Sequence, residues 1–193
     1  MNEFTTVRQI YNYPSLKTSD YDMICSRHEK VQIAKGDFLL REGQIANEYF
    51  CLEEGLIRAY ANSFEGNEVT TAFFSPGDIV IEVASLFLRS QTKENIQALT
   101  DCTCWKISFS EFQELFQTIN AFTEWGRTWM ARALFSTKER SLAMITDSAT
   151  DRYLALLSEN PEILHYAPLK HVASYLGITD TSLSRIRKYI SSK

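Results

Sequence analysis

Histidine and cysteine are scarce in this chain, and it has no long apolar run. Only three histidines and four cysteines occur among its 193 residues. No segment reaches the roughly 20 apolar residues of a membrane-spanning helix, and the N-terminus lacks the apolar core of a signal peptide. No two cysteines form a CxxC pair, so their spacing suits neither zinc nor an iron–sulfur cluster. These absences predict a cytoplasmic protein with no membrane partner and no metal.

The cysteines are therefore expected to be reduced thiols rather than ligands or disulfide partners. They are Cys25, Cys51, Cys102 and Cys104. Cys102 and Cys104 lie two residues apart, so in a strand they would face the same side. We expect them to serve as small apolar packing groups there.

The chain is acidic as a whole but basic at its C-terminal end. Its formal net charge is −4, whereas residues 168–193 carry five lysines or arginines against one aspartate. A basic segment on an acidic body is typical of a nucleic-acid-binding module. Because 45% of the residues are hydrophobic, the chain can form the cores of one ordinary domain and a smaller one.

The basic segment begins with the pattern of a short amphipathic helix. Leu169, Val172, Ala173 and Leu176 recur at the i, i+3, i+4 and i+7 positions of one helix face. Pro168 suits the first helical position, where a missing N–H group costs nothing. This pattern predicts a helix of about two turns.

A tight turn and a second helix follow. Gly177 suits the positive φ of a helix end, and the side chain of Thr179 can cap the next helix. That helix has an apolar face formed by Leu183, Ile186 and Ile190 and a polar face formed by Asp180, Thr181, Ser184, Arg185 and Lys188. The two helices predict a DNA-binding helix-turn-helix, the alternative being a helical hairpin that only packs.

The stretch from residue 28 to residue 108 has the period of β-structure. Its short segments are rich in β-branched and aromatic residues, and glycines separate them at intervals of 7, 12, 11 and 11 residues. This spacing predicts an all-β sandwich or barrel. A metalloenzyme of the cupin type, which shares such architecture, would need histidine ligands on the strands. No histidine occurs between Val31 and Ser108, so we expect no enzyme.

A long helix is predicted between the β-region and the basic segment, over residues 118–146, which contain no proline. About thirty helical residues would reach about 45 Å. Two stripes at heptad spacing run along it, and the sequence does not decide which one faces a partner. The first stripe is Ile119, Phe122, Gly126, Trp129, Ala133, Ser136, Arg140 and Ala143, and the second is Met130, Leu134, Thr137, Ser141 and Met144.

Three segments resemble a known domain. Residues 35–60, 75–82 and 96–116 (KGDFLLREGQIANEYFCLEEGLIRAY, SPGDIVIE and IQALTDCTCWKISFSEFQELF) resemble the β-roll of the cyclic-nucleotide-binding domain. With the helix-turn-helix, the whole chain resembles a Crp/Fnr-type transcription regulator. The resemblance implies an α+β fold with a double-stranded β-helix (jelly-roll) domain at residues 1–117, a dimerisation helix at 118–147 and a DNA-binding domain at 148–193. That domain would be winged-helix-like, but only three residues follow the second reader helix, so the wing is expected to be missing.

The effector site departs from the pattern of the cyclic-AMP-binding members. Glu82 matches the ribose-binding glutamate, but Ile81 stands where they have glycine. Thr92 and Lys93 stand where they have an arginine and a hydroxyl residue. Arg89 and Lys93 could supply charge nearby, and Thr137 matches the threonine that contacts the purine. We expect cyclic AMP to bind weakly or not at all, so the effector is another small molecule or is absent.

The resemblance also implies partners. Arg185 matches the arginine that such regulators place in the DNA major groove, and Lys170 and Lys188 suit phosphate contacts. The predicted DNA-binding residues are Lys170, Thr179, Asp180, Thr181, Ser184, Arg185 and Lys188. We expect double-stranded DNA, a second copy of the chain and RNA polymerase as partners. An effector-independent regulator, or a protein-interaction module with a degenerate nucleotide pocket, is the alternative.

Overall fold

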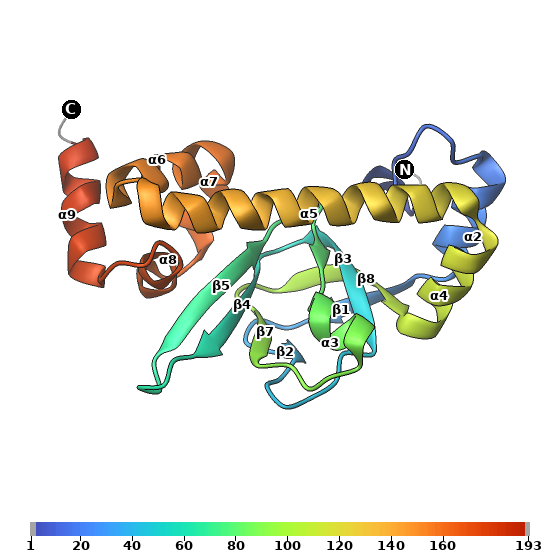
Figure 1. Ribbon diagram of the computed structural model, residues 1–193, viewed down its shortest axis with the longest axis horizontal. Helices are drawn as coiled ribbons and strands as arrows, with labels where there is room; N and C mark the ends of the chain where they lie inside the picture. The colour runs from blue at the N-terminus through green and yellow to red at the C-terminus, as the bar shows by residue number, and fades with distance from the viewer. Residues whose placement is uncertain (1–2, 192–193) are drawn as a thin grey trace.

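The computed structural model describes residues 3–191 and shows an α+β protein with three parts (Figure 1). A β-roll flanked by N-terminal helices lies beneath one long helix, and a group of short helices gathers at the far end of that helix. None of the helices within residues 3–191 has the length and apolar character needed to cross a bilayer. The predicted fold class is confirmed.

The helices and strands alternate in blocks along the chain. The strands are β1 (Glu29–Ile33), β2 (Phe38–Leu40), β3 (Glu48–Glu54), β4 (Ile57–Asn62), β5 (Glu68–Phe74), β6 (Ile79–Val80), β7 (Glu94–Ala98) and β8 (Cys102–Ser108). The helices are α1 (Thr5–Ile10), α2 (Thr18–Ser26), α3 (Val83–Leu88), α4 (Phe109–Thr118), α5 (Asn120–Thr146), α6 (Ala149–Glu159), α7 (Pro161–Tyr166), α8 (Leu169–Tyr175) and α9 (Asp180–Ser191).

The β-roll consists of two four-stranded antiparallel sheets. Their strand orders are β1-β8-β3-β6 and β2-β7-β4-β5, so the chain crosses repeatedly from one sheet to the other. One crossing is the turn at Gly55, between β3 and β4. Its φ is +103°, and a Cβ there would lie 2.6 Å from both the Asp101 carbonyl oxygen and the Cys102 sulfur. Glycine is therefore required by both backbone conformation and space.

The four cysteines are buried and free; the sequence predicted reduced thiols, with a packing role for Cys102 and Cys104. Burial raises the pKa of Cys51 and of Cys104 to about 12. Cys102 and Cys104 are both buried on β8, 1% and 0% exposed, which confirms that they face the same side. Thiols that stay protonated in an apolar core are unreactive, so their role is packing.

A buried polar cluster joins the N-terminal helices to the roll. The Tyr11 hydroxyl lies 2.9 Å from His28 Nε2 and 2.8 Å from the Tyr49 hydroxyl. His28 Nδ1 lies 2.8 Å from the Ile24 carbonyl oxygen. Since that carbonyl can only accept, the ring is protonated on Nδ1 and accepts from Tyr11 on Nε2. Burial lowers the pKa of His28 to about 4, so the ring is neutral in the folded protein.

Stability is expected to fall as the pH is lowered from about 6.5 to about 4. The unfolded histidine titrates near pH 6.5, whereas folded His28 stays neutral down to about pH 4. The unfolded state therefore binds more protons within this pH window, and this lowers the free energy of unfolding by up to about 3 kcal/mol. Burial also lowers the pKa of His171 to about 4. Denaturant titrations at several pH values should show the loss, and His28→Gln should reduce but not abolish the slope. A stability that is flat over this window would contradict the prediction.

The long helix is close to its predicted bounds. It begins at Asn120, after a break at Ile119 that separates it from α4, and it ends at Thr146. One boundary was wrong: Pro168 is the N-cap of α8 and not its first helical residue, because its ψ of 137° is extended. Pro168 still keeps α7 and α8 from forming one continuous helix, because proline has no N–H group to donate to a preceding turn.

Candidate functional site

The helix-turn-helix consists of α8, a short turn and α9. Val172, Ala173, Leu176 and Leu183 are at most 3% exposed and pack with residues of α6 in one core. Gly177 has the expected positive φ, +67°, and a Cβ there would lie 2.5 Å from the Met144 side chain. The turn therefore holds α9 at a fixed angle to α8 and close to the end of α5.

The polar face of α9 is open to solvent. All seven predicted DNA-binding residues are exposed, namely Lys170, Thr179, Asp180, Thr181, Ser184, Arg185 and Lys188. The Thr179 hydroxyl accepts a hydrogen bond from the Ser182 amide at 3.2 Å, which confirms its expected role as a cap. Asp180 lies in the first turn of α9, where a negative charge favours the helix dipole. This leaves Thr181, Ser184, Arg185 and Lys188 as one free polar face.

Two arginines join α5 to the helix-turn-helix. Arg152 on α6 donates to the carbonyl oxygens of Asp147 (2.6 Å) and Leu176 (2.9 Å). Arg140 on α5 donates to the Tyr175 carbonyl oxygen of α8 at 3.2 Å and to the Thr71 carbonyl oxygen of β5 at 2.6 Å. These carbonyl groups belong to different parts of the chain, so the two arginines hold the helix-turn-helix in one orientation.

The β-roll contains a cavity of about 570 Å³. Its wall is formed by β2, β3, β6 and β7 and by neighbouring loops, and includes Leu39, Gln44, Glu48, Ile81, Glu82 and Gln91. No lysine or arginine is among the described residues that line it. The cavity therefore offers two carboxylates and several amides but no cation to neutralise a phosphate.

The structure brings only one predicted effector residue, Glu82, to the cavity wall. Its carboxylate also accepts from the Ser85 amide at the start of α3. Arg89 is not among the lining residues, but its guanidinium donates to the Ala46 carbonyl and the Asn47 side chain, which belong to the wall. The Thr92 hydroxyl accepts from the Glu94 amide, so it serves the local turn.

The two remaining predicted effector residues also lie outside the wall. Lys93 is exposed to solvent. Thr137 is exposed on α5, and its hydroxyl donates to the Ala133 carbonyl at 2.8 Å. Gln44 and Gln91 line the cavity but were not predicted, because an amide carries no sequence signal that distinguishes a ligand contact from a surface residue.

The structure separates the two stripes of α5. Residues of the first stripe face the protein's own body, with Phe122 0% exposed and Gly126 against the Phe116 ring. The opposite face is open and apolar. Its exposed large side chains are Met130, Leu134, Phe135, Leu142, Met144 and Ile145. Packing of the first stripe therefore leaves the second stripe exposed, namely Met130, Leu134, Thr137, Ser141 and Met144.

Comparison with known proteins agrees with this architecture. The family model of the cyclic nucleotide-binding domain matches residues 30–119. Electron transport regulator A of Shewanella oneidensis is 23% identical over 177 residues, covering 86% of this chain and 69% of that protein. The structure of FixK2 from Bradyrhizobium japonicum superposes with a TM-score of 0.74 at 18% identity, covering 86% of this chain and 85% of FixK2.

A Crp/Fnr-family protein from Eubacterium rectale gives a TM-score of 0.70 at 20% identity and covers 92% of this chain and 84% of its own. The family-model match lies in the β-roll and α4, whereas the sequence match to electron transport regulator A covers 86% of the chain and the structural match to the Eubacterium rectale protein covers 92%. Residues 30–119 thus match the cyclic nucleotide-binding domain, and the chain has the fold of the Crp/Fnr-type regulators.

Proposed function

We propose that this protein is a DNA-binding transcription regulator that acts as a homodimer and carries an effector cavity in its β-roll. The observation that carries the proposal is the exposed polar and basic face of α9 at the end of a packed helix-turn-helix. In such a motif the second helix enters the major groove with its N-terminal residues nearest the bases. Thr181, Ser184 and Arg185 take that position here, and Lys170 and Lys188 suit phosphate contacts.

Selection from a random duplex library tests the DNA-binding proposal. A dimer of this fold should enrich inverted repeats whose half-sites lie about 34 Å apart, one turn of DNA. Gel-shift titrations of the selected duplex at low and moderate salt should show tighter binding than a scrambled duplex at both salt concentrations. If no sequence is enriched and the scrambled duplex binds equally, the proposal of a specific regulator is wrong.

Cyclic AMP is not expected to stabilise the protein. A ligand that binds only the folded state raises the melting temperature, by an amount equivalent to about 2.7 kcal/mol at a hundred times its Kd. The cavity wall presents Glu48 and Glu82 but no cation, so a cyclic phosphate would meet repulsion. A thermal-shift titration with cyclic AMP should therefore show no change, and a shift at micromolar concentrations would contradict this.

The thermal-shift assay can also test whether the missing cation is the reason that cyclic AMP does not bind. An arginine at Thr92 would restore the sequence pattern, but Thr92 is 5% exposed and bonded to its own turn. Gln91 lines the cavity instead. We expect Gln91→Arg to create a thermal shift with cyclic AMP, whereas Lys93→Arg, which adds no charge and lies outside the wall, should not.

A further inference from the structure

The cavity of the β-roll combines an apolar surface with two carboxylates from different elements. Its buried apolar lining residues, which are at most 8% exposed, include Leu40, Phe50, Val80 and Ile96. Glu48 comes from β3, and Glu82 immediately precedes α3. A cavity of about 570 Å³ has the size of a site for a small organic molecule.

The Glu82 carboxylate lacks a counter-charge. It accepts a hydrogen bond from the Ser85 amide and, within residues 3–191, forms no ion pair. Glu48 is only weakly paired, since Lys106 Nζ lies 4.0 Å from its carboxylate but 3.1 Å from that of Glu29. Two such carboxylates beside an apolar surface attract a cation, because apolar surroundings screen the attraction less than water does.

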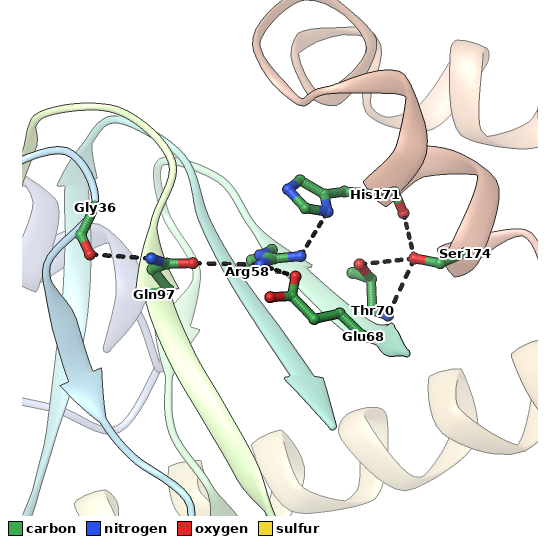
Figure 2. A network of polar contacts seen from close by, with 7 residues as sticks. All are labelled: Gly36, Arg58, Glu68, Thr70, Gln97, His171 and Ser174. Carbon is green, nitrogen blue, oxygen red and sulfur yellow. Dashed lines mark hydrogen bonds and ion pairs between the residues drawn. The ribbon is translucent and has the colours of Figure 1, made fainter. Parts of the chain in front are cut away.

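The buried arginine of the roll, Arg58, does not supply the missing charge. It lies on β4 opposite Gln97 of β7, and successive residues of a strand face opposite sides of a sheet. Ile96 lines the cavity, so Gln97 and Arg58 face away from it. Figure 2 shows the guanidinium on that other face, where its partners are Glu68, Gln97 and His171.

Two arginines close to the wall also have other partners. Arg89 donates to the Ala46 carbonyl and the Asn47 side chain, which are neutral acceptors. Arg41 lies over the Phe38 ring, 3.6 Å from its centre. Within residues 3–191, neither guanidinium is bonded to a carboxylate of the wall. An anionic ligand would therefore meet two carboxylates and gain no guanidinium partner.

A metal ion matches this cavity less well than an organic cation does. Within the part of the chain that the structure describes, no group of three or more His, Cys, Asp or Glu side chains could hold one. Mg²⁺ and Ca²⁺ take about six to eight oxygen ligands, whereas much of this wall is apolar. An organic ammonium or guanidinium needs fewer oxygen partners, and its carbon skeleton gains from apolar burial.

We propose that the cavity binds a small organic cation, in which an ammonium or guanidinium group is carried on an apolar body. The cationic group lies against Glu82 and Glu48, and the apolar body packs on the buried lining residues. The amides of Gln44, Asn47 and Gln91, which also line the cavity, contact polar substituents of the ligand. The inference rests on the proposed function, because it names the class of effector that the β-roll of the regulator takes.

Three probes with the same phenylethyl body test the charge preference. Phenethylammonium, 2-phenylethanol and 3-phenylpropionate carry an ammonium, a hydroxyl and a carboxylate group on it. Ligand-observed NMR titrations should show phenethylammonium binding at least about tenfold more tightly than the alcohol, and no binding of the carboxylate. Absence of phenethylammonium binding at millimolar concentration, or equal binding of all three probes, would overturn the proposal.

Glu82→Gln locates the binding site. The glutamine carbonyl can still accept from the Ser85 amide, so the start of α3 is retained. Affinity for phenethylammonium should fall at least about tenfold. Glu65→Gln is the matched control, because it removes the same charge from an exposed residue of the β4–β5 turn. It should change nothing, and equal losses in the two variants would mean unspecific attraction to an acidic protein, which contradicts the proposal.

Gln91→Arg gives an independent test that keeps both carboxylates. It places a cation in the wall, so binding of phenethylammonium should weaken several-fold while 3-phenylpropionate begins to bind. Lys93→Arg, outside the wall, should change neither. Melting curves confirm that each variant is folded, and a folded Gln91→Arg variant with unchanged preferences would overturn the proposal.

DNA binding separates this inference from the function on which it rests. Probe binding is measured without DNA, and duplex selection without a probe. If the wild-type protein binds its selected duplex but not phenethylammonium, the ligand class is wrong. If it binds phenethylammonium but enriches no duplex, the proposed regulator is wrong, and the cavity remains a site for organic cations.

Discussion

Leu134→Glu/Ile145→Glu is expected to convert the proposed dimer into monomers and to lower affinity for an inverted-repeat duplex at least about 100-fold. Both side chains are on the open face of α5, 67% and 83% exposed, and burying each against a partner contributes about 1.5–3 kcal/mol. A glutamate at either position would put a charge into the apolar seam. Monomers also lose the gain of about 10²–10⁴ in affinity that comes from binding two half-sites together. Analytical ultracentrifugation and gel-shift titration measure the two effects.

The matched control is Arg132→Glu, which lowers the net charge by two, as the double variant does. Arg132 is exposed and lies two residues before Leu134, hence about 160° around the helix. This variant should remain dimeric. A half-site duplex gives a second control, because the double variant should bind it as the wild type does. If the double variant is still dimeric at micromolar concentration, the seam lies elsewhere.

Arg185→Ala is expected to cost about 1–3 kcal/mol on the selected duplex and to relax its sequence preference. A guanidinium can donate two parallel hydrogen bonds to O6 and N7 of guanine, and Arg185 is exposed on the free face of α9. Lys188→Ala should instead weaken binding to all DNA sequences equally, because a phosphate contact carries no sequence information. It should also lower the slope of log K against log salt concentration by about one. Titrations on selected and scrambled duplexes at several salt concentrations distinguish the two roles.

Arg187→Ala is the control for charge. It removes the same side chain two residues further along α9, on the flank of the buried Leu183 rather than on the free face. We expect a small loss that is equal on both duplexes. If Arg185→Ala also lowers the affinity for the selected and the scrambled duplex equally, Arg185 contacts phosphate and not a base.

Much of the architecture could be predicted from local sequence. The periodicity of apolar residues along the chain predicts first the strands, then a long proline-free helix, and then two short amphipathic helices. Gly177 and Thr179 marked the turn correctly, because positive φ and capping are local requirements. The apolar packing of Cys102 and Cys104 was likewise expected, because residues two apart on a strand face the same side.

The effector site could be predicted far less well. The sequence identified Glu82, but whether Arg89 or Thr92 faces the cavity depends on the turn after α3, where Arg89 has a φ of 55°. That turn directs the guanidinium to the Ala46 carbonyl. A one-residue change in such a turn redirects every following side chain, so counting along the sequence cannot place them.

The sequence by itself determined the order of the parts, the apolar stripes of the helices and the basic reader at the C-terminal end, because each depends on residues close together in the chain. Only the tertiary structure decided which stripe of α5 is open and where the reader rests. Arg58 and His171 are 113 residues apart, and neither carries a local sign of the other. Their contact exists because the folded roll and α5 bring β4 and α8 together, and long-range packing of this kind follows from the shape of the whole core.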